Sequence, residues 1–236
     1  MQTESGQTQR RVARPHDAAS LILVDRSGAT PRFLMGLRHE RHSFMPGYMV
    51  FPGGRLDASD RHMRVYGMLS PHTERNLMAQ TVRPSPAKAR ALALCALREM
   101  FEETGMLIGE SDLGEPPVTS QAWRGFAEHG VYPSAEALHF VARAITPPAF
   151  PRRYDTRFFI AEAQHVALTV EGAFGPDSEL TEVRWLTRAQ AEAENLAPIT
   201  RVILGEASRR LDDGLENDLP VPFFRELRGL WRRDEI

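Results

Sequence analysis

Three glutamates lie close together on one predicted helix. In the stretch from Ala96 to Met106, Glu99, Glu102 and Glu103 recur at spacings of three and four residues, which brings side chains to the same face of an α-helix. Carboxylates that converge in this way repel one another unless a cation lies between them. Oxygen ligands suit Mg²⁺ or Mn²⁺ better than zinc. The spacing indicates a divalent-metal site, although a solvated acidic face would show the same pattern.

The residues around these glutamates predict how the helix is placed and where it ends. The opposite side of the helix carries apolar residues at the spacing of a buried face: Leu94, Leu97, Met100 and Phe101. Arg98 borders the carboxylates and can reach Glu102 one turn further on. Gly105 supplies a left-handed helix cap. We therefore expect Arg98 and the three glutamates within one long helix, with the carboxylates facing a cleft.

A Gly-Gly turn precedes this helix, in the segment Phe51-Pro52-Gly53-Gly54-Arg55. The turn and the helix together resemble the Nudix box, whose pattern is Gly, five residues, Glu, seven residues, Arg-Glu-apolar-x-Glu-Glu-x-Gly. With five residues between it and Gly54, Asp60 stands where the first glutamate belongs. Counted back from Arg98, the same position falls on Arg90. The two halves of the box are therefore separated by an insertion at about residues 58–90.

The resemblance implies an α/β fold, a Nudix-type α/β/α sandwich with a mixed β-sheet, and hydrolysis of a diphosphate linkage. It implies that the three box glutamates hold Mg²⁺ or Mn²⁺ and that Arg98 orients them. Glu179, six residues before Trp185, matches a position used in related enzymes as a further metal ligand or catalytic base, with Glu182 as a nearby competitor. Gly53 and Gly54 would let the backbone approach the site, which a side chain would block.

The interrupted box is similar to the Nudix branch that includes peroxisomal coenzyme A diphosphatases. A coenzyme A pattern of that family precedes the box, and Leu34, Arg38, Gly47 and the Phe-Pro-Gly-Gly turn keep its spacing, whereas Ser43 replaces its second arginine. The resemblance implies coenzyme A or acyl-coenzyme A as substrate. Residues expected to bind substrate are Arg38, Phe51, Gly53, Gly54, Arg55 and Arg157, with Arg152 and Arg153 as further phosphate contacts. Alternatively, Arg38 only ends a strand and Gly47 only makes a turn.

Two other functions stay open at this point. The chain could be a broad diphosphatase for nucleotide sugars, ADP-ribose or NADH, or a Nudix-fold module that binds such a ligand without cleaving it. The intact glutamates and Arg98 favour an enzyme. The insertion could form a lid, a dimerisation element or a neutral surface excursion.

Composition limits the remaining possibilities. With 236 residues, a net charge of −2 and a pI near 6.5, we expect a flexible tail at 1–14 and a single domain at 15–236. The balanced charge argues against a nucleic-acid partner, and the sequence has no segment long and apolar enough to anchor in a membrane. One cysteine, Cys95, fits a reducing, cytoplasmic location. The expected partner is a small nucleotide-derived substrate, with a homodimer possible.

Hydrophobic periodicity and turn residues predict the other elements. We expect strands at 18–24, 32–37, 141–146 and 156–161, and another that ends near Trp185. Short helices are expected at 73–80, 120–129 and 134–139, and amphipathic helices at 187–195, 198–212 and 222–232.

Overall fold

The computed structural model describes residues 13–41, 45–118, 120–172, 178–215 and 218–236. Most of the expected tail, and Ser43 of the coenzyme A pattern, lie outside the described residues. No described helix combines the length and the apolar character needed to cross a membrane.

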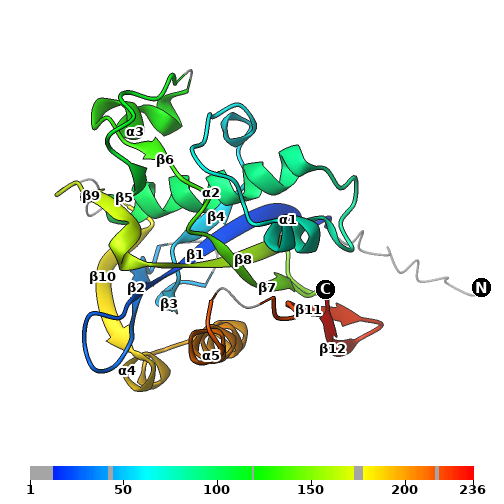
Figure 1. Ribbon diagram of the computed structural model, residues 1–236. Helices are drawn as coiled ribbons and strands as arrows, with labels where there is room; N and C mark the ends of the chain where they lie inside the picture. Colours follow the sequence, from blue (N-terminus) through cyan, green and yellow to red (C-terminus); the bar gives the residue numbers. More distant parts are fainter. Residues whose placement is uncertain (1–12, 42–44, 119, 173–177, 216–217) are drawn as a thin grey trace, which may run out of the picture.

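A nine-stranded mixed sheet forms the centre of the molecule (Figure 1). The strands follow the order β10-β2-β1-β8-β7-β11-β12, with β3 paired to β2 and β4 paired to β1. The pairs β1–β8 and β7–β11 are parallel and the others are antiparallel. The strands are β1 (His16–Asp25), β2 (Arg32–Arg38), β3 (Met49–Val50), β4 (Gly53–Arg55), β7 (His139–Ile145), β8 (Tyr154–Glu162), β10 (Leu180–Thr187), β11 (Pro222–Leu227) and β12 (Leu230–Glu235).

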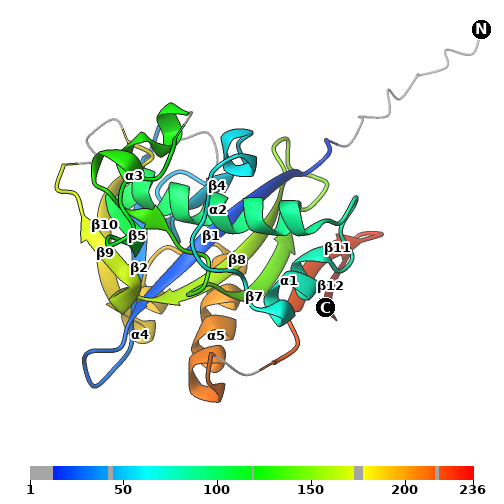
Figure 2. The ribbon, with the colours of Figure 1, turned by 45° about the horizontal axis from the view of Figure 1, so that its top comes forward.

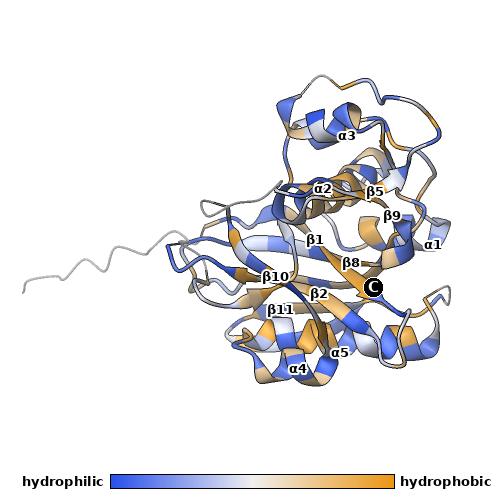
Figure 3. Cartoon of the chain, turned by 90° about the vertical axis from the view of Figure 1, so that its left-hand side faces the viewer, coloured by the Kyte–Doolittle hydropathy of each residue, from blue (hydrophilic) through white to orange (hydrophobic). Residues whose placement is uncertain are grey.

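Helices cover both faces of this sheet. The long helix α2 (Pro86–Thr104) lies on one face, and α4 (Arg188–Ala193) and α5 (Pro198–Asp213) lie on the other (Figures 1 and 3). Alternate residues of β1 fill the two cores, because successive side chains of a strand point to opposite faces. Leu21 and Leu23 pack on the α2 side, whereas Ile22 and Val24 pack on the α5 side. This arrangement confirms the expected α/β/α sandwich with a mixed sheet.

A second, three-stranded sheet lies beside α2. It consists of β5 (Met106–Glu110), β6 (Tyr132–Pro133) and β9 (Val166–Thr169), and β9 follows the 3₁₀ turn η3 (Ala163–His165). The turn η2 (Gln121–Trp123) and α3 (Arg124–Glu128) lie beside it, and Phe126 meets Phe101 of α2 edge-on with ring centroids 5.7 Å apart. Every residue from Ala91 to Arg98 is buried, so α2 has a much wider buried surface than the single apolar stripe predicted.

The ends of α2 follow from its sequence. The Ser85 hydroxyl accepts a hydrogen bond from the Lys88 N–H at 3.1 Å, and Pro86 occupies the first turn, where its missing N–H costs nothing. Gly105 ends the helix with φ of 73° and donates its N–H to Phe101 O, as expected of a left-handed cap. Arg98 and the box glutamates therefore lie in one helix of 19 residues.

The insertion packs into the molecule instead of leaving its surface. It contains the turn η1 (Ser59–Arg61) and α1 (Pro71–Met78). Met63, Leu69 and Leu77 are buried in the same hydrophobic cluster as α2. This burial argues against a neutral surface excursion, because these side chains contribute to the common core.

Two expected helices are wrong. The segment expected as a helix at 222–232 is instead the hairpin β11–β12 at the edge of the sheet (Figure 2). Arg228 and Gly229, the two residues of its turn, have φ of 53° and 78°, a conformation that matches the twist of a hairpin. The segment at 134–139 contains a bridge between Ser134 and Tyr66 followed by a turn, so its polar start caps no helix.

Candidate active site

Arg98 lies at the centre of the site and is bound to Asp60 from the insertion. Its Nε donates to Asp60 Oδ1 at 2.8 Å and its Nη2 donates to Asp60 Oδ2 at 3.1 Å. The Asp60 side chain is fully buried and that of Arg98 is 5% exposed. Burial opposes the charge of Arg98, but the bond to Asp60 and the nearby Glu99 raise its pKa overall. Asp60 therefore serves as the partner that fixes the guanidinium.

The same guanidinium orients two of the glutamates. Arg98 Nη1 donates to Glu99 Oε1 and to Glu102 Oε2, both at 2.8 Å. Its Nη2 also donates to the carbonyl of Arg55 at 3.0 Å, which ties the helix to the Gly-Gly turn. One arginine thus connects the insertion, the turn and the carboxylates.

The Gly-Gly turn approaches the carboxylates closely enough to need glycine. A Cβ on Gly54 would lie 2.6 Å from both oxygens of the Glu99 carboxylate, well inside contact distance. A Cβ on Gly53 would lie 2.6 Å from the Ala19 carbonyl oxygen. The Gly53 N–H donates to Glu103 Oε2 at 2.9 Å. The backbone itself therefore forms one wall of the carboxylate cluster.

The glutamates are held in a shared, partly dehydrated environment. Burial raises the pKa of Glu99 to about 7, and the neighbouring Glu102 and Glu179 add to the shift. Burial also raises the pKa of Glu103 well above its ordinary value, with further contributions from Glu179 and Glu99. Burial raises the pKa of Glu102 against the opposing effect of Arg98. Such shifts are expected when several carboxylates share one buried site.

Glu179, and not Glu182, joins this group. Glu179 precedes β10 and forms an ion pair with Arg38 at 2.7 Å between Nη1 and Oε1, and its charge acts on both Glu99 and Glu103. Glu182 is half exposed and pairs with Arg184. Of the two acidic candidates, the geometry brings only Glu179 towards the box glutamates.

The donor set fits a hard divalent cation. All of the converging groups are carboxylates, and Glu103 Oε1 is buried without a hydrogen-bond partner among the described residues. A buried, unsatisfied anionic oxygen is costly unless a ligand completes its coordination. In the described parts of the chain, the acidic side chains do not form a ready-made set of three metal ligands.

Two residues expected to bind substrate have structural surroundings instead. Arg157 is fully buried and its Nη1 pairs with Asp17 at 2.8 Å and with Asp155 at 3.2 Å. Its burial lowers its pKa. Because the side chain is fully buried, a phosphate cannot reach it without disrupting the core. Phe51 is 5% exposed and packs in the cluster on the α5 side. The structure therefore does not bring Arg157 to the site, and it places Phe51 in the core below the turn.

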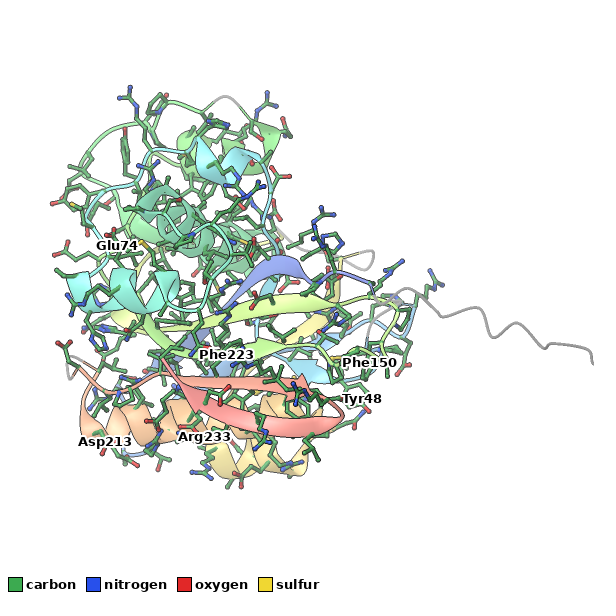
Figure 4. All side chains as sticks on the ribbon, turned by 90° about the vertical axis from the view of Figure 1, so that its right-hand side faces the viewer. Tyr48, Glu74, Phe150, Asp213, Phe223 and Arg233 are labelled. Atoms are coloured by element: carbon green, nitrogen blue, oxygen red, sulfur yellow. The ribbon has the colours of Figure 1, made fainter. Side chains whose placement is uncertain are left out.

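The buried arginines continue towards the edge of the sheet. Arg143 of β7 pairs with Asp155 at 2.7 Å, and its guanidinium lies over the ring of Phe223 at 4.2 Å. Phe223 is labelled on β11 in Figure 4. This network joins three neighbouring strands, so it stabilises the sheet and takes no part in the carboxylate cluster.

Arg55 follows the turn and has a different neighbourhood. Its side chain is exposed and lines a cavity of about 290 Å³ together with Arg14, His16, Arg152 and Arg153. A second cavity of about 200 Å³ lies between the insertion and the 117–123 segment, and Ser59, His62 and Trp123 line it. The sequence identified Arg55 as a substrate-binding residue and Arg152 and Arg153 as phosphate contacts, but nothing in it linked them to Arg14 or His16.

Comparison with known proteins assigns the class of the enzyme. The structure of a NUDIX hydrolase from Alicyclobacillus acidocaldarius resembles this one with a TM-score of 0.60 and 26% sequence identity, over 83% of this chain and 91% of that one. The protein is a Nudix hydrolase, an enzyme that acts on diphosphate bonds. Residues 15–197 match the model of the NUDT19 Nudix domain, and the chain belongs to this family.

Similar sequences include an acyl-coenzyme A diphosphatase and another Nudix hydrolase. The chain is 27% identical over 256 residues to the acyl-coenzyme A diphosphatase NUDT19 of Homo sapiens, covering 80% of this chain and 67% of that protein. It is also 27% identical over 182 residues to putative nudix hydrolase 7 of Caenorhabditis elegans, covering 72% of this chain and 50% of the relative. The chain thus spans about half to two thirds of the length of these relatives.

Proposed function

We propose that this Nudix hydrolase cleaves the diphosphate of coenzyme A or acyl-coenzyme A, with Mg²⁺ or Mn²⁺ as cofactor. The products would be adenosine 3′,5′-bisphosphate and a phosphopantetheine. The observation that carries the proposal is the position of Arg38, the arginine of the coenzyme A pattern. Arg38 is almost completely buried and pairs with Glu179 beside the box glutamates, so the pattern and the carboxylates belong to one site.

The backbone around Arg38 explains why the spacing of the pattern matters. The Arg38 N–H donates to Tyr48 O at 2.9 Å, and the Gly47 N–H donates to Arg38 O at 3.1 Å. These two bonds join Arg38, at the end of β2, to the residues just before β3. Gly47 has φ of 69°, which favours glycine. The pattern thus supports a role for Arg38 in the site beyond ending a strand.

The residues of the chain have distinct parts in the proposed reaction. A bound divalent cation would neutralise charge on the diphosphate and lower the pKa of a coordinated water. Glu99, Glu102 and Glu103 would hold it, with Arg98 fixing their orientation. Glu179 would accept the proton of the attacking water. Arg38 would leave Glu179 for a substrate phosphate, because an arginine fork pairs equally well with either group.

The broad diphosphatase and the binding module remain as alternatives. A screen that resolves products from coenzyme A, ADP-ribose, NADH and diadenosine polyphosphates, with Mg²⁺ and Mn²⁺ in turn, tests all three. We expect coenzyme A or its acyl esters to have the highest kcat/KM. Equal cleavage of ADP-ribose would favour the broad enzyme, and binding without turnover would favour the module. The single cysteine supports a reducing compartment, for which we propose the cytoplasm.

A further inference from the structure

The cavity beside Arg55 has an unusual concentration of positive charge. Four guanidinium groups line it, from Arg14, Arg55, Arg152 and Arg153, and the His16 imidazole adds a fifth cationic group when protonated. Among the described residues that line it, none is acidic. Like charges this close repel one another unless an anion lies among them, so the cavity favours an anionic ligand.

Backbone hydrogen bonds hold the cavity wall in place. Arg153 Nε donates to Thr146 O at 2.9 Å, and its Nη1 donates to Ala13 O at 2.7 Å. The His16 N–H donates to Arg153 O at 2.9 Å. The β7–β8 connection, in which Phe150 is labelled in Figure 4, is thereby tied to the start of β1. Both acceptors of the Arg153 side chain are neutral carbonyls, so its charge is positioned but not neutralised.

Two of the other arginines also keep their charge available. Within the described parts of the chain, neither Arg14 nor Arg55 has a carboxylate partner, and both side chains are exposed. Arginine forks of this kind match the oxygens of a phosphate monoester, which carries nearly two negative charges. A monoester fits this cavity better than a carboxylate, which has one charge and only two oxygens to share among the arginines.

The cavity begins one residue from Gly54, whose backbone lies against the Glu99 carboxylate. Gly54 faces Glu99, and Arg55 is its neighbour, whose Cα lies about 3.8 Å along the chain. Because side chains alternate along a strand, Gly54 faces the carboxylates and the Arg55 side chain points to the other side of β4. Among the described strands β4 pairs only with β1. For one ligand to reach both sides, it must pass around the other edge of β4.

We infer that this cavity, the Arg14–Arg55–Arg152–Arg153 cavity, binds a phosphate monoester carried on the same nucleotide whose diphosphate is cleaved at the glutamates. The inference rests on the proposed function, because coenzyme A has such a group on its adenosine ribose. The cavity would be a substrate-recognition site separate from Arg38. The cavity selects nucleotides with a 3′-phosphate, and the glutamates select the diphosphate.

Binding of the nucleotide product tests this cavity without any turnover. Calorimetry would compare adenosine 3′,5′-bisphosphate with AMP, using the intact chain and the double variant Arg14→Gln/Arg55→Gln. We expect the double variant to lose about tenfold or more of its affinity for the bisphosphate and much less for AMP. Arg26→Gln is the matched control, because Arg26 is an exposed arginine that pairs with Glu162 just beyond the opposite end of β1 from His16. It should bind both ligands as the unaltered chain does.

Kinetics then separate failure of the cavity from failure of the proposed function. The ratio of kcat/KM for coenzyme A over dephospho-coenzyme A should fall about tenfold in the double variant. If the bisphosphate and AMP lose affinity equally, or neither loses any, the cavity does not read the monoester, even if coenzyme A is cleaved. If the selective loss in binding appears but coenzyme A is not cleaved, binding of the monoester in the cavity is supported and the proposed reaction is contradicted.

Discussion

The Arg98 guanidinium and the Asp60 carboxylate form a two-point buried ion pair that bridges 38 positions of sequence. The resemblance to the Nudix box left the position of the first acidic residue in conflict, because Asp60 fits the count from Gly54 and Arg90 fits the count from Arg98. The structure resolves this conflict. Arg90 is exposed, near the start of α2, whereas the insertion folds back so that Asp60 reaches Arg98.

Replacing Asp60 tests whether this pair positions the site. Asp60→Asn would remove the fully buried carboxylate that pairs with Arg98. Breaking a buried ion pair typically costs about 3–5 kcal/mol of unfolding free energy. We expect a clear loss of stability in denaturant titrations and a lower kcat, because Arg98 also orients Glu99 and Glu102. The exposed Asp112→Asn should change neither. Unchanged stability and kcat in Asp60→Asn would rule out the positioning role.

Gly54 offers a test that changes only one methyl group. In Gly54→Ala the new Cβ would meet the Glu99 carboxylate at 2.6 Å, so the carboxylate or the turn must move. We expect turnover to fall by about tenfold or more, since misplaced catalytic groups are costly. Gly28→Ala is the matched control, because nothing lies within 4 Å of its added Cβ. Equal activity of the two variants would contradict the close approach.

How much of this site the sequence could predict depends on how local each signal is. The helix, its cap at Gly105 and the convergence of the glutamates follow from spacing within one element, and the structure has the helix and the cap. The pairing of Arg98 with Asp60 and the burial of Arg157 depend on which strands and loops become neighbours. Spacing along the chain holds no such information, so Arg157 looked like one more arginine available to phosphate.

The edge of the sheet shows the same limit. The segment 222–232 contains apolar and charged residues that suit an amphipathic helix as well as a hairpin. The turn at Arg228 and Gly229, and the pairing of Phe223 and Phe224 with β7, decide in favour of strands. A tertiary partner thus outweighs local propensity here.

Glu103→Gln tests the role of the buried carboxylate as a metal ligand. The amide oxygen can still accept the Gly53 N–H, but the negative charge is lost. We expect turnover to fall at least about a hundredfold, the effect of losing several kcal/mol of transition-state stabilisation, while circular dichroism stays unchanged. Weaker Mn²⁺ binding in titrations should accompany the loss. The exposed Glu115→Gln is the control. Full turnover of Glu103→Gln in saturating Mg²⁺ would move the chemistry to other residues.

The pH dependence of stability follows from Glu99, whose pKa in the folded protein is about 7, against 4.5 for an ordinary glutamate carboxyl. The folded state therefore binds the proton more tightly than the unfolded state does. The metal-free protein should lose stability as pH rises from about 4.5 through 7, by up to about 3 kcal/mol from this group. Glu99→Gln should flatten that slope, whereas the exposed Glu110→Gln should not. Denaturant titrations at pH 5 and 8 measure both. An unchanged slope in Glu99→Gln would contradict the shift.

The substrate assignment is tested at Arg38. Arg38→Ala removes the buried guanidinium that pairs with Glu179, and with it the proposed contact to a phosphate of coenzyme A. Because that contact stands in the coenzyme A pattern, we expect kcat/KM for coenzyme A to fall by about tenfold or more, and that for ADP-ribose to fall less. Steady-state kinetics with both substrates measure the difference. Arg26→Gln again serves as the control for removing an arginine elsewhere. An equal fall for the two substrates would mean that Arg38 supports the site without reading coenzyme A, and the broad diphosphatase would become the better description.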